Sequence, residues 1–135
     1  MDKLYESDCF RASFDKQQSI VLCQSLSVDT TPKELNDLLG LFDYMLTESK
    51  KNNKKFSIHF DCSEYLPNDY YNFLYTIASY LNNTTDIGET LKCTAFVVNG
   101  GFEIDLFMSM HTPTTPFKLC ATKEEAFIYI SEQNS

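Results

Sequence analysis

The spacing of apolar residues changes repeatedly along this chain, between the period of two that is typical of strands and the period of about 3.6 that is typical of helices. This alternation constrains the fold more than any other feature of the sequence. From residue 31 onward, segments with helical spacing alternate with segments of strand composition. We therefore expect an α/β fold with a mainly parallel sheet, right-handed crossovers and helices packed on the sheet.

The expected order of elements is β-β-α-β-α-β-α-β-α, beginning with a hairpin. With 135 residues, the chain has the length of one domain, whose core is expected to cover about 10–131. The expected strands cover 9–14, 19–26, 56–62, 91–98 and 116–120, and the expected helices cover 31–50, 67–81, 102–110 and 122–130.

Two short motifs mark helix starts. Thr31-Pro32-Lys33-Glu34 combines a capping hydroxyl, a proline suited to the first helical position and the acid of a capping box. Thr122-Lys123-Glu124-Glu125 is a second capping box. Apolar residues after the first motif recur at helical spacing and predict one buried stripe: Leu35, Leu38, Leu39, Phe42, Met45 and Leu46.

The charge of the chain excludes several classes of partner. The 11 Lys and Arg stand against 19 Asp and Glu, which gives a net charge of −8. Nucleic acids and anionic membrane surfaces are bound mainly through Lys and Arg, so neither is expected as a partner. The cluster Lys50, Lys51, Lys54 and Lys55 is interpreted as a solvated helix end, with a site for an acidic partner as the alternative.

The sequence indicates a cytoplasmic location. The acidic stretch 1–8 lacks the apolar core of a secretory signal, and no apolar run approaches the roughly 18 residues of a membrane span. The five cysteines are widely spaced and form no C-x-x-C pair, so we expect buried, reduced thiols.

Motifs for catalysis or metal binding are sparse. His59 lies within an expected strand and is interpreted as a partly buried structural residue, and His111 ends an expected helix, where a cation complements the helix dipole. Neither has a Cys, His or acid at a metal-ligand spacing, so no metal and no cofactor are expected. Without a nucleophile elbow, a zinc-protease motif or a Walker loop, the chain is not expected to be an enzyme.

Gly100 and Gly101 follow an expected strand and precede an expected helix, where backbone N–H groups can hold an anion. A plain tight turn explains the same residues, and Glu103 and Asp105 directly after them would repel an anion. Anion binding at Gly100 and Gly101 is therefore only a weak candidate.

Three local features, taken in order, resemble the STAS family (sulfate transporter and anti-sigma factor antagonist domains), especially its SpoIIAA-like branch, which is related to the lipid-binding CRAL-TRIO proteins. The first is a strand that ends in Asp61-Cys62-Ser63 before a helix. The second is the run Ala95-Phe96-Val97-Val98-Asn99. The third is the closing strand from Pro116, followed by Glu124-Glu125-Ala126. The likeness covers about 10–131.

The resemblance implies a regulatory or scaffolding module that binds a partner protein and, in many members, is switched by phosphorylation at the start of the second helix. Such a switch suits a helix N-terminus, which tolerates added negative charge. Where the family has Asp-Ser-x-Gly, this chain has Pro67-Asn68-Asp69-Tyr70, and Ser63 is interpreted as a turn residue. The candidate partner-binding or switch residues are Asp61, Ser63, Asn68, Asp69, Tyr70 and Tyr71.

The aromatic residues leave three interpretations open. Tyrosines are dense around the second helix, and tyrosine is enriched at protein interfaces; the cluster comprises Tyr65, Tyr70, Tyr71, Tyr75 and Tyr80. The aromatic side chains could instead pack the core, or line a cavity for a small apolar ligand or lipid, as in CRAL-TRIO carriers. A homodimer is also left open.

Overall fold

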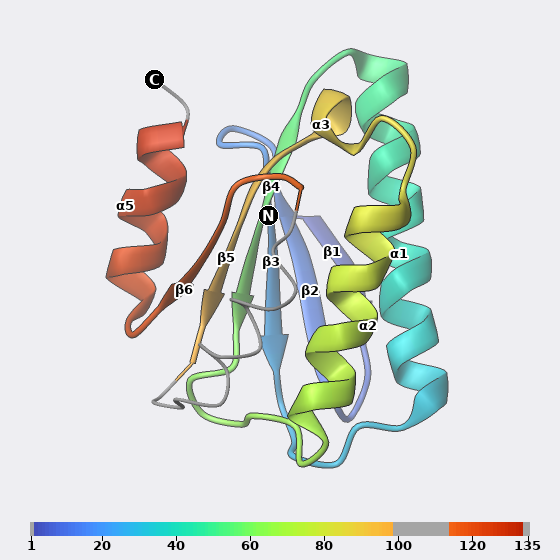
Figure 1. The fold of residues 1–135 in the computed structure, drawn as a ribbon, viewed down its shortest axis with the longest axis vertical. Coiled ribbons are helices and arrows are strands. Elements are labelled where there is room, and N and C mark those ends of the chain that lie inside the picture. The colour runs from blue at the N-terminus through green and yellow to red at the C-terminus, as the bar shows by residue number, and fades with distance from the viewer. Residues whose placement is uncertain (1, 99–113, 134–135) are drawn as a thin grey trace.

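The computed structural model describes residues 2–98 and 114–133, which form a single α/β domain on one six-stranded sheet (Figure 1). The strands are β1 (Asp2–Glu6), β2 (Phe10–Asp15), β3 (Ile20–Ser25), β4 (Phe56–Asp61), β5 (Leu91–Val97) and β6 (Phe117–Cys120). The four helices of the described residues are α1 (Pro32–Asn52), α2 (Tyr70–Asn83), α3 (Ile87–Thr90) and α5 (Lys123–Gln133).

The strands lie in the sheet in their order along the chain. β1, β2 and β3 pair antiparallel in succession, and β3, β4, β5 and β6 pair parallel in succession. The sheet is therefore mixed, with two antiparallel and three parallel pairings, and the expectation of a mainly parallel sheet is not confirmed. The carboxyl ends of β3 to β6 meet at one edge, because parallel strands run in the same direction.

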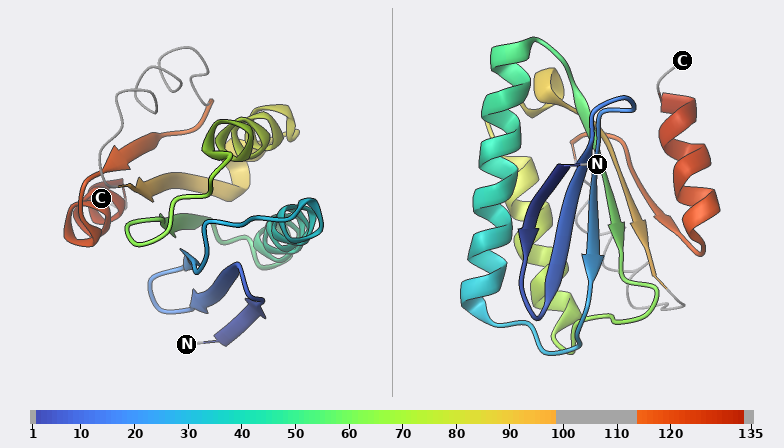
Figure 2. Two further views of the ribbon diagram at one scale, coloured as in Figure 1. Left: turned by 90° about the horizontal axis from the view of Figure 1, so that it is seen from below. Right: turned by 180° about the vertical axis from the view of Figure 1, so that it is seen from behind.

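The helices form layers on both sides of the sheet. α1 and α2 cover one face, and α5 covers the other face over β4, β5 and β6 (Figures 1 and 2). The strand β4 lies between these layers, and all six of its residues are buried. No helix lies over the α5-side face of β1 and β2 in the described part of the chain (Figure 2).

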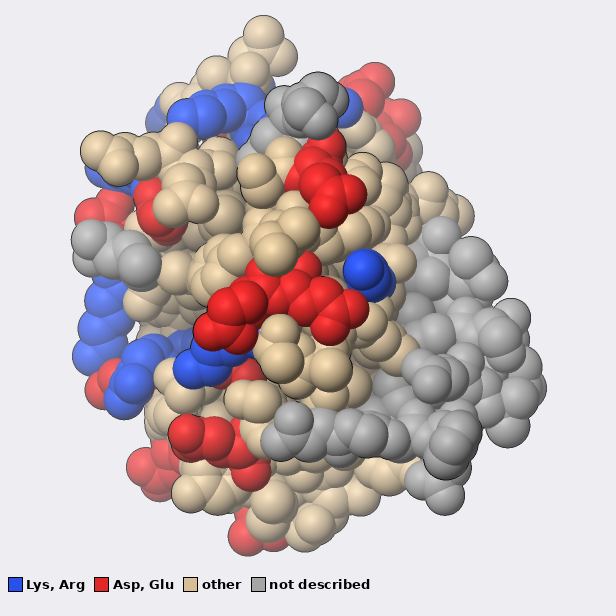
Figure 3. All heavy atoms as spheres, turned by 90° about the vertical axis from the view of Figure 1, so that its left-hand side faces the viewer, with Lys and Arg blue, Asp and Glu red and all other residues tan. Residues whose placement is uncertain are grey.

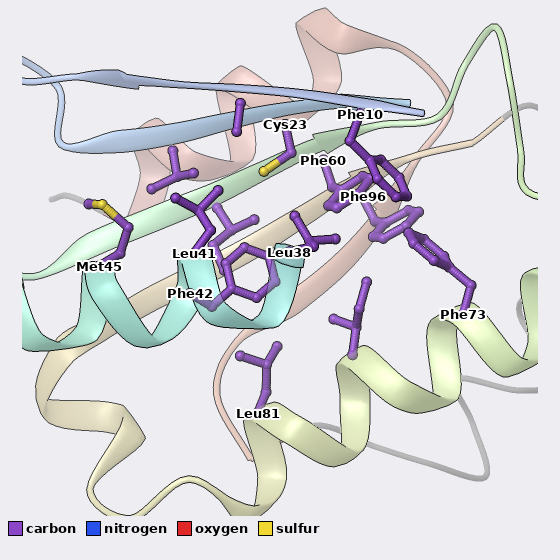
Figure 4. Packing of buried hydrophobic residues seen from close by; sticks show 14 of the residues in the cluster. Phe10, Cys23, Leu38, Leu41, Phe42, Met45, Phe60, Phe73, Leu81 and Phe96 are labelled. Atoms are coloured by element: carbon purple, nitrogen blue, oxygen red, sulfur yellow. The ribbon is translucent and has the colours of Figure 1, made fainter. Parts of the chain in front are cut away.

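The main core lies between the sheet and the pair α1 and α2, and phenylalanines fill its carboxyl end (Figure 4). The rings of Phe60 and Phe96 stack with centroids 4.9 Å apart, and those of Phe10 and Phe73 stack at 5.6 Å. Burial of such rings supplies a large part of the hydrophobic stabilisation. The expectation that aromatic side chains fill the core is confirmed for these four residues.

The two predicted helix-capping motifs are confirmed by the structure. Thr31 caps α1, its hydroxyl oxygen accepting a hydrogen bond of 3.2 Å from the backbone N–H of Glu34. The hydroxyl oxygen of Thr122 accepts one of 3.1 Å from the backbone N–H of Glu125. α1 ends at Asn53, whose left-handed conformation closes the helix. Of the predicted stripe, only Leu39 is partly rather than fully buried.

The expected order of elements was wrong in two places, and the start of one helix was misplaced. β1 and α3 were not expected at all. The second helix was expected from Pro67 but begins at Tyr70. The expected turn at 99–101 and helix at 102–110, with Gly100, Gly101 and His111, lie outside the described residues. Within 2–98 and 114–133, no helix is both long and apolar enough to cross a bilayer.

Candidate functional site

The loops that leave β3 and β4 meet at the carboxyl edge of the sheet, and the loop after β4 carries the predicted site residues Ser63, Asn68 and Asp69. In sheets with parallel strands, this edge is where ligands and partners most often bind. Asn68 lies in the loop after β4, and its backbone N–H donates a hydrogen bond of 2.8 Å to the carbonyl oxygen of Val28 in the loop after β3. The two loops therefore form one continuous surface.

Asp61 is the last residue of β4 and is only 6% exposed. Its carboxylate accepts a hydrogen bond of 2.9 Å from the backbone N–H of Ser63 and lies 3.4 Å from Nζ of Lys123 in α5. Burial alone would raise the pKa of Asp61, but the hydrogen bonding from Ser63 and the charge of Lys123 outweigh it and lower the pKa. Asp61 therefore joins the loop after β4 to α5.

Ser63 lies in the turn that Asp61 organises, as the sequence indicates, because a carboxylate that accepts from the N–H two residues later forms an Asx turn. The side-chain amide of Asn68 donates a hydrogen bond of 3.4 Å to the carboxylate of Asp29. Asp69 occupies the N-cap position of α2 without a side-chain capping bond, and its carbonyl oxygen accepts from the N–H of Phe73.

A groove of about 430 Å³ runs between the N-terminal halves of α1 and α2. It brings the predicted residues Asn68 and Asp69 together with the start of α1, which sequence reasoning did not connect with them. Its walls combine amides and hydroxyls with a few apolar side chains. The groove is lined by Val28, Asp29, Thr30, Thr31, Pro32, Leu35, Asn36, Pro67, Asn68, Asp69, Asn72, Phe73 and Thr76.

The two predicted tyrosines at the start of α2 lie on different flanks of the helix. Tyr70 is partly buried and packs against the main core, whereas Tyr71 is 50% exposed. Tyr75, one turn later on the same flank, is 47% exposed, and Tyr65 in the preceding loop is 42% exposed. We call Tyr65, Tyr71 and Tyr75 the tyrosine surface. The helical spacing of 71 and 75 could have identified this pair from sequence.

A second concave site lies on the opposite face of the sheet, and the sequence analysis missed it. It is a hollow of about 190 Å³ between α5 and the open part of the sheet. His59 forms part of its wall and is 3% exposed, more buried than expected. The hollow is lined by Arg11, Ser13, Leu22, Cys23, Gln24, His59, Asp61, Lys123 and Phe127.

His59 is held in an environment that disfavours its charged form. Its ring stacks on that of Phe127, with the centroids 4.4 Å apart. Burial lowers the pKa of His59, the nearby Asp61 carboxylate opposes this shift, and the Lys123 ammonium adds to it. The buried Nε2 atom has no hydrogen-bond partner within the described part of the chain.

The cysteines are buried and form no disulfide, as the sequence predicts. Burial raises the pKa of Cys23 to about 12. Burial, together with hydrogen bonding to Glu34 and its charge, raises the pKa of Cys9 to about 11. Thiols with such pKa values carry little nucleophilic thiolate at neutral pH. Among residues 2–98 and 114–133, no group of three His, Cys, Asp or Glu could hold a metal ion.

A third depression, of about 460 Å³, lies between α1 and the β1–β2 hairpin. Phe14, Met45 and Phe56 give it an apolar floor, and Lys16 and Glu48 stand among the charged residues of its lining. Met45 and Phe56 are buried parts of the main core. The depression is therefore an apolar groove with charged residues around it.

No protein-family model, no curated protein and no solved structure matches this chain. The function is therefore argued from the chain's own residues.

Proposed function

We propose that this chain is a non-enzymatic regulatory or scaffolding module that binds a partner protein through the carboxyl edge of its sheet. The observation that carries the proposal is the tyrosine surface, whose three side chains are 42–50% exposed along the loop after β4 and the first turns of α2. Tyrosine offers a large, rigid contact area with a polar tip, and it is enriched among residues that dominate binding energy.

The groove between α1 and α2 supports the same location. Asn68 and Asp69 line it and directly precede α2 in the chain, so the groove and the tyrosine surface share the start of α2. A partner that contacts the exposed rings could place a side chain in this groove. Asp61 takes a positioning role in the proposal, because its carboxylate is occupied by Ser63 and Lys123.

The proposal includes the STAS-like character expected from the sequence. The parallel order β3-β4-β5-β6, with α1 and α2 between successive strands, supports a STAS-like arrangement. The high pKa values of Cys9 and Cys23 disfavour these two thiols as nucleophiles, and five unpaired cysteines support a cytoplasmic location. Ser63, Tyr70 and Tyr71 remain the candidate hydroxyls of a switch, and Tyr71 is the one half exposed.

Affinity capture from native lysate tests the proposal. The bait is the wild-type chain, the double variant Tyr71→Ala/Tyr75→Ala, and the control Tyr44→Ala, which removes a tyrosine of similar exposure (53%) from α1. We expect a partner that is retained by the wild type and the control and lost from the double variant. Identical partners for all three proteins would reject the tyrosine surface, and sedimentation of the purified chain would identify a second copy as the partner.

The groove between α1 and the β1–β2 hairpin favours a second candidate function, the binding of a small apolar ligand or lipid. Phe14, Met45 and Phe56 offer an apolar floor, and a volume of about 460 Å³ falls within the range of small-molecule sites. Native mass spectrometry after gentle purification tests it. A retained apolar ligand supports a carrier, whereas protein that is always free of ligand rejects one.

A further inference from the structure

The hollow beside α5 is lined by two parallel rows of side chains, which the strand register defines. Arg11 pairs with Gln24 and Gln24 with Asp61, so these three form one row across β2, β3 and β4. Leu22 pairs with His59 in the adjacent row. Cross-strand partners project from the same face of a sheet. The first row is polar. The second begins with the polar Ser13, which pairs with Leu22, and continues through Leu22 and His59, the part that we call the apolar row.

Helix α5 places one side chain at the end of each row, a charged one beside the polar row and an aromatic one beside the apolar row. Lys123 stands 3.4 Å from the Asp61 carboxylate at the end of the polar row. Phe127, one turn later, stacks on His59 at the end of the apolar row and is 40% exposed. The hollow therefore offers hydrogen-bonding groups along one side and apolar and aromatic side chains along the other.

The polar row contains both donors and acceptors. Arg11 and Lys123 donate, and the amide of Gln24 can donate and accept. The Asp61 carboxylate contacts Ser63 and Lys123, and its remaining lone pairs can still accept on the side of the hollow. In the wall of the same hollow, the buried His59 Nε2 has no partner within the described part of the chain. Buried polar groups are normally hydrogen-bonded, so this nitrogen is an unsatisfied group inside the wall, and the contacts to a ligand come from the accessible polar row.

The charges around the hollow nearly cancel. Lys123 is paired with Asp61, and Nε of Arg11 donates a hydrogen bond of 2.9 Å to the carboxylate of Glu6. Acidic side chains also gather on the face of the molecule that carries α5 (Figure 3), and the whole chain has a net charge of −8. An anionic ligand would meet this negative field, and a cationic one would meet two cations. The balance favours a neutral ligand.

We propose that this hollow binds a small, neutral heteroaromatic ring of the nucleobase class. A flat ring suits the wall formed by Leu22, His59 and Phe127, and a ring edge with both donors and acceptors suits the row formed by Arg11, Gln24 and Asp61. The volume of about 190 Å³ lies below the usual range for drug-sized ligands, which limits the occupant to a small ring. The site is separate from the tyrosine surface.

Nuclear magnetic resonance titration of the full chain with adenine tests the proposal. We expect shifts concentrated on the Leu22 methyl groups, the Gln24 side-chain amide and the His59 ring. Two variants target the two rows: Phe127→Ala removes the aromatic wall, and Gln24→Leu removes the amide while keeping its bulk. Each is expected to weaken adenine binding about tenfold, the scale of one base–aromatic stack or one buried hydrogen-bonding pair.

Matched variants and ligands make the test specific. Ile128→Ala alters the next residue of α5, which is 60% exposed and does not line the hollow, and Gln18→Leu alters a glutamine at the β2–β3 turn. Both should bind adenine like the wild type. Benzoate and adenosine monophosphate, which add negative charge, should bind more weakly than adenine. Absent or scattered shifts, equal binding by all variants, or tighter binding of either anion would overturn the proposal.

Discussion

The imidazole of His59 stacks on the ring of Phe127 with their centroids 4.4 Å apart and their planes inclined by 22°. This contact joins the central strand β4 to the terminal helix α5. His59 is buried, and its Nε2 atom has no partner within the described part of the chain. Burial of the neutral ring is therefore unfavourable because Nε2 is unsatisfied, and burial of the charged ring would be more unfavourable still.

The variant His59→Phe is expected to be at least as stable as the wild type at about pH 7.5. Phenylalanine keeps a flat ring against Phe127 and removes a buried nitrogen that lacks a partner, so we expect a gain of about 1 kcal/mol in the free energy of unfolding. Urea denaturation measures it. A loss of more than about 2 kcal/mol would mean that Nε2 makes a favourable interaction in the folded protein.

The stability of the wild type should fall as the solution becomes mildly acidic. Burial lowers the pKa of His59 in the folded state, so the unfolded state takes up the proton first, from about pH 6.5 downward. The contribution of the neutral His59 to the free energy of unfolding is fully present above that pH. It is lost as the pH falls toward the pKa of His59 in the folded state. Urea denaturation between about pH 7.5 and 5 should show a decline that His59→Phe lacks. Parallel curves for the two proteins would contradict this assignment.

Glu34 is expected to be one of the most important polar residues for stability. Its carboxylate accepts hydrogen bonds from the hydroxyl of Ser7, the backbone N–H of Cys9 and the hydroxyl of Thr31, so it links the β1–β2 turn to the start of α1. Glu34→Ala should lower the free energy of unfolding by about 1–3 kcal/mol. The neighbouring control Lys33→Ala loses only an exposed ion pair and should change it by less than about 1 kcal/mol. Similar losses in both variants would contradict this role.

Asp61 is expected to stabilise the edge of the sheet. Asp61→Ala removes the acceptor of the Ser63 N–H and should cost about 1–3 kcal/mol, whereas Asp61→Asn retains an acceptor oxygen and should cost less. The lowered pKa of Asp61 means that its contribution is present above the unfolded pKa of about 3.9 and is lost as the pH falls through the folded pKa. Acid denaturation of the three proteins should therefore converge at low pH. Equal stability of the three proteins at neutral pH would contradict a stabilising role of Asp61.

The two flanks of α2 should respond differently to mutation. Phe73 is 2% exposed and packs against Phe10 and Phe60, so Phe73→Ala should cost about 3–5 kcal/mol. Tyr75 is about half exposed, and Tyr75→Ala should change stability by less than about 1 kcal/mol. Thermal unfolding distinguishes the two. A large loss in Tyr75→Ala would show that the tyrosine surface contributes to the fold and would weaken its use as a binding surface.

Local signals were sufficient for much of the fold. The capping motifs at Thr31 and Thr122 lie where their helices begin, because a cap depends on residues close in sequence. β1 was missed because it is a charged edge strand and its register shifts between Lys3 and Tyr5, which interrupts the alternation of apolar residues. The start of α2 was misplaced because the N–H of Asn68 bonds to Val28, forty residues earlier in the chain.

The candidate sites depended on contacts that no local pattern reveals. Asp61 and Asn68, predicted as partner-binding or switch residues, lie at the carboxyl edge, but the pairing of Asp61 with Lys123 requires α5 to fold back over β4. The same return of α5 places Phe127 over His59 and forms the hollow. Sequence alone also could not show that Tyr70 is partly buried and Tyr71 exposed, because their exposure depends on which flank of α2 meets the sheet.

Photo-crosslinking in cells tests the central claim, that the tyrosine surface contacts a partner protein. A benzophenone-bearing amino acid is placed at Tyr71 in one protein and at Tyr44, an equally exposed tyrosine of α1, in another. We predict a discrete crosslinked protein species from position 71 and none from position 44. No crosslink at position 71, or the same crosslinks at both positions, would contradict the proposed partner-binding surface.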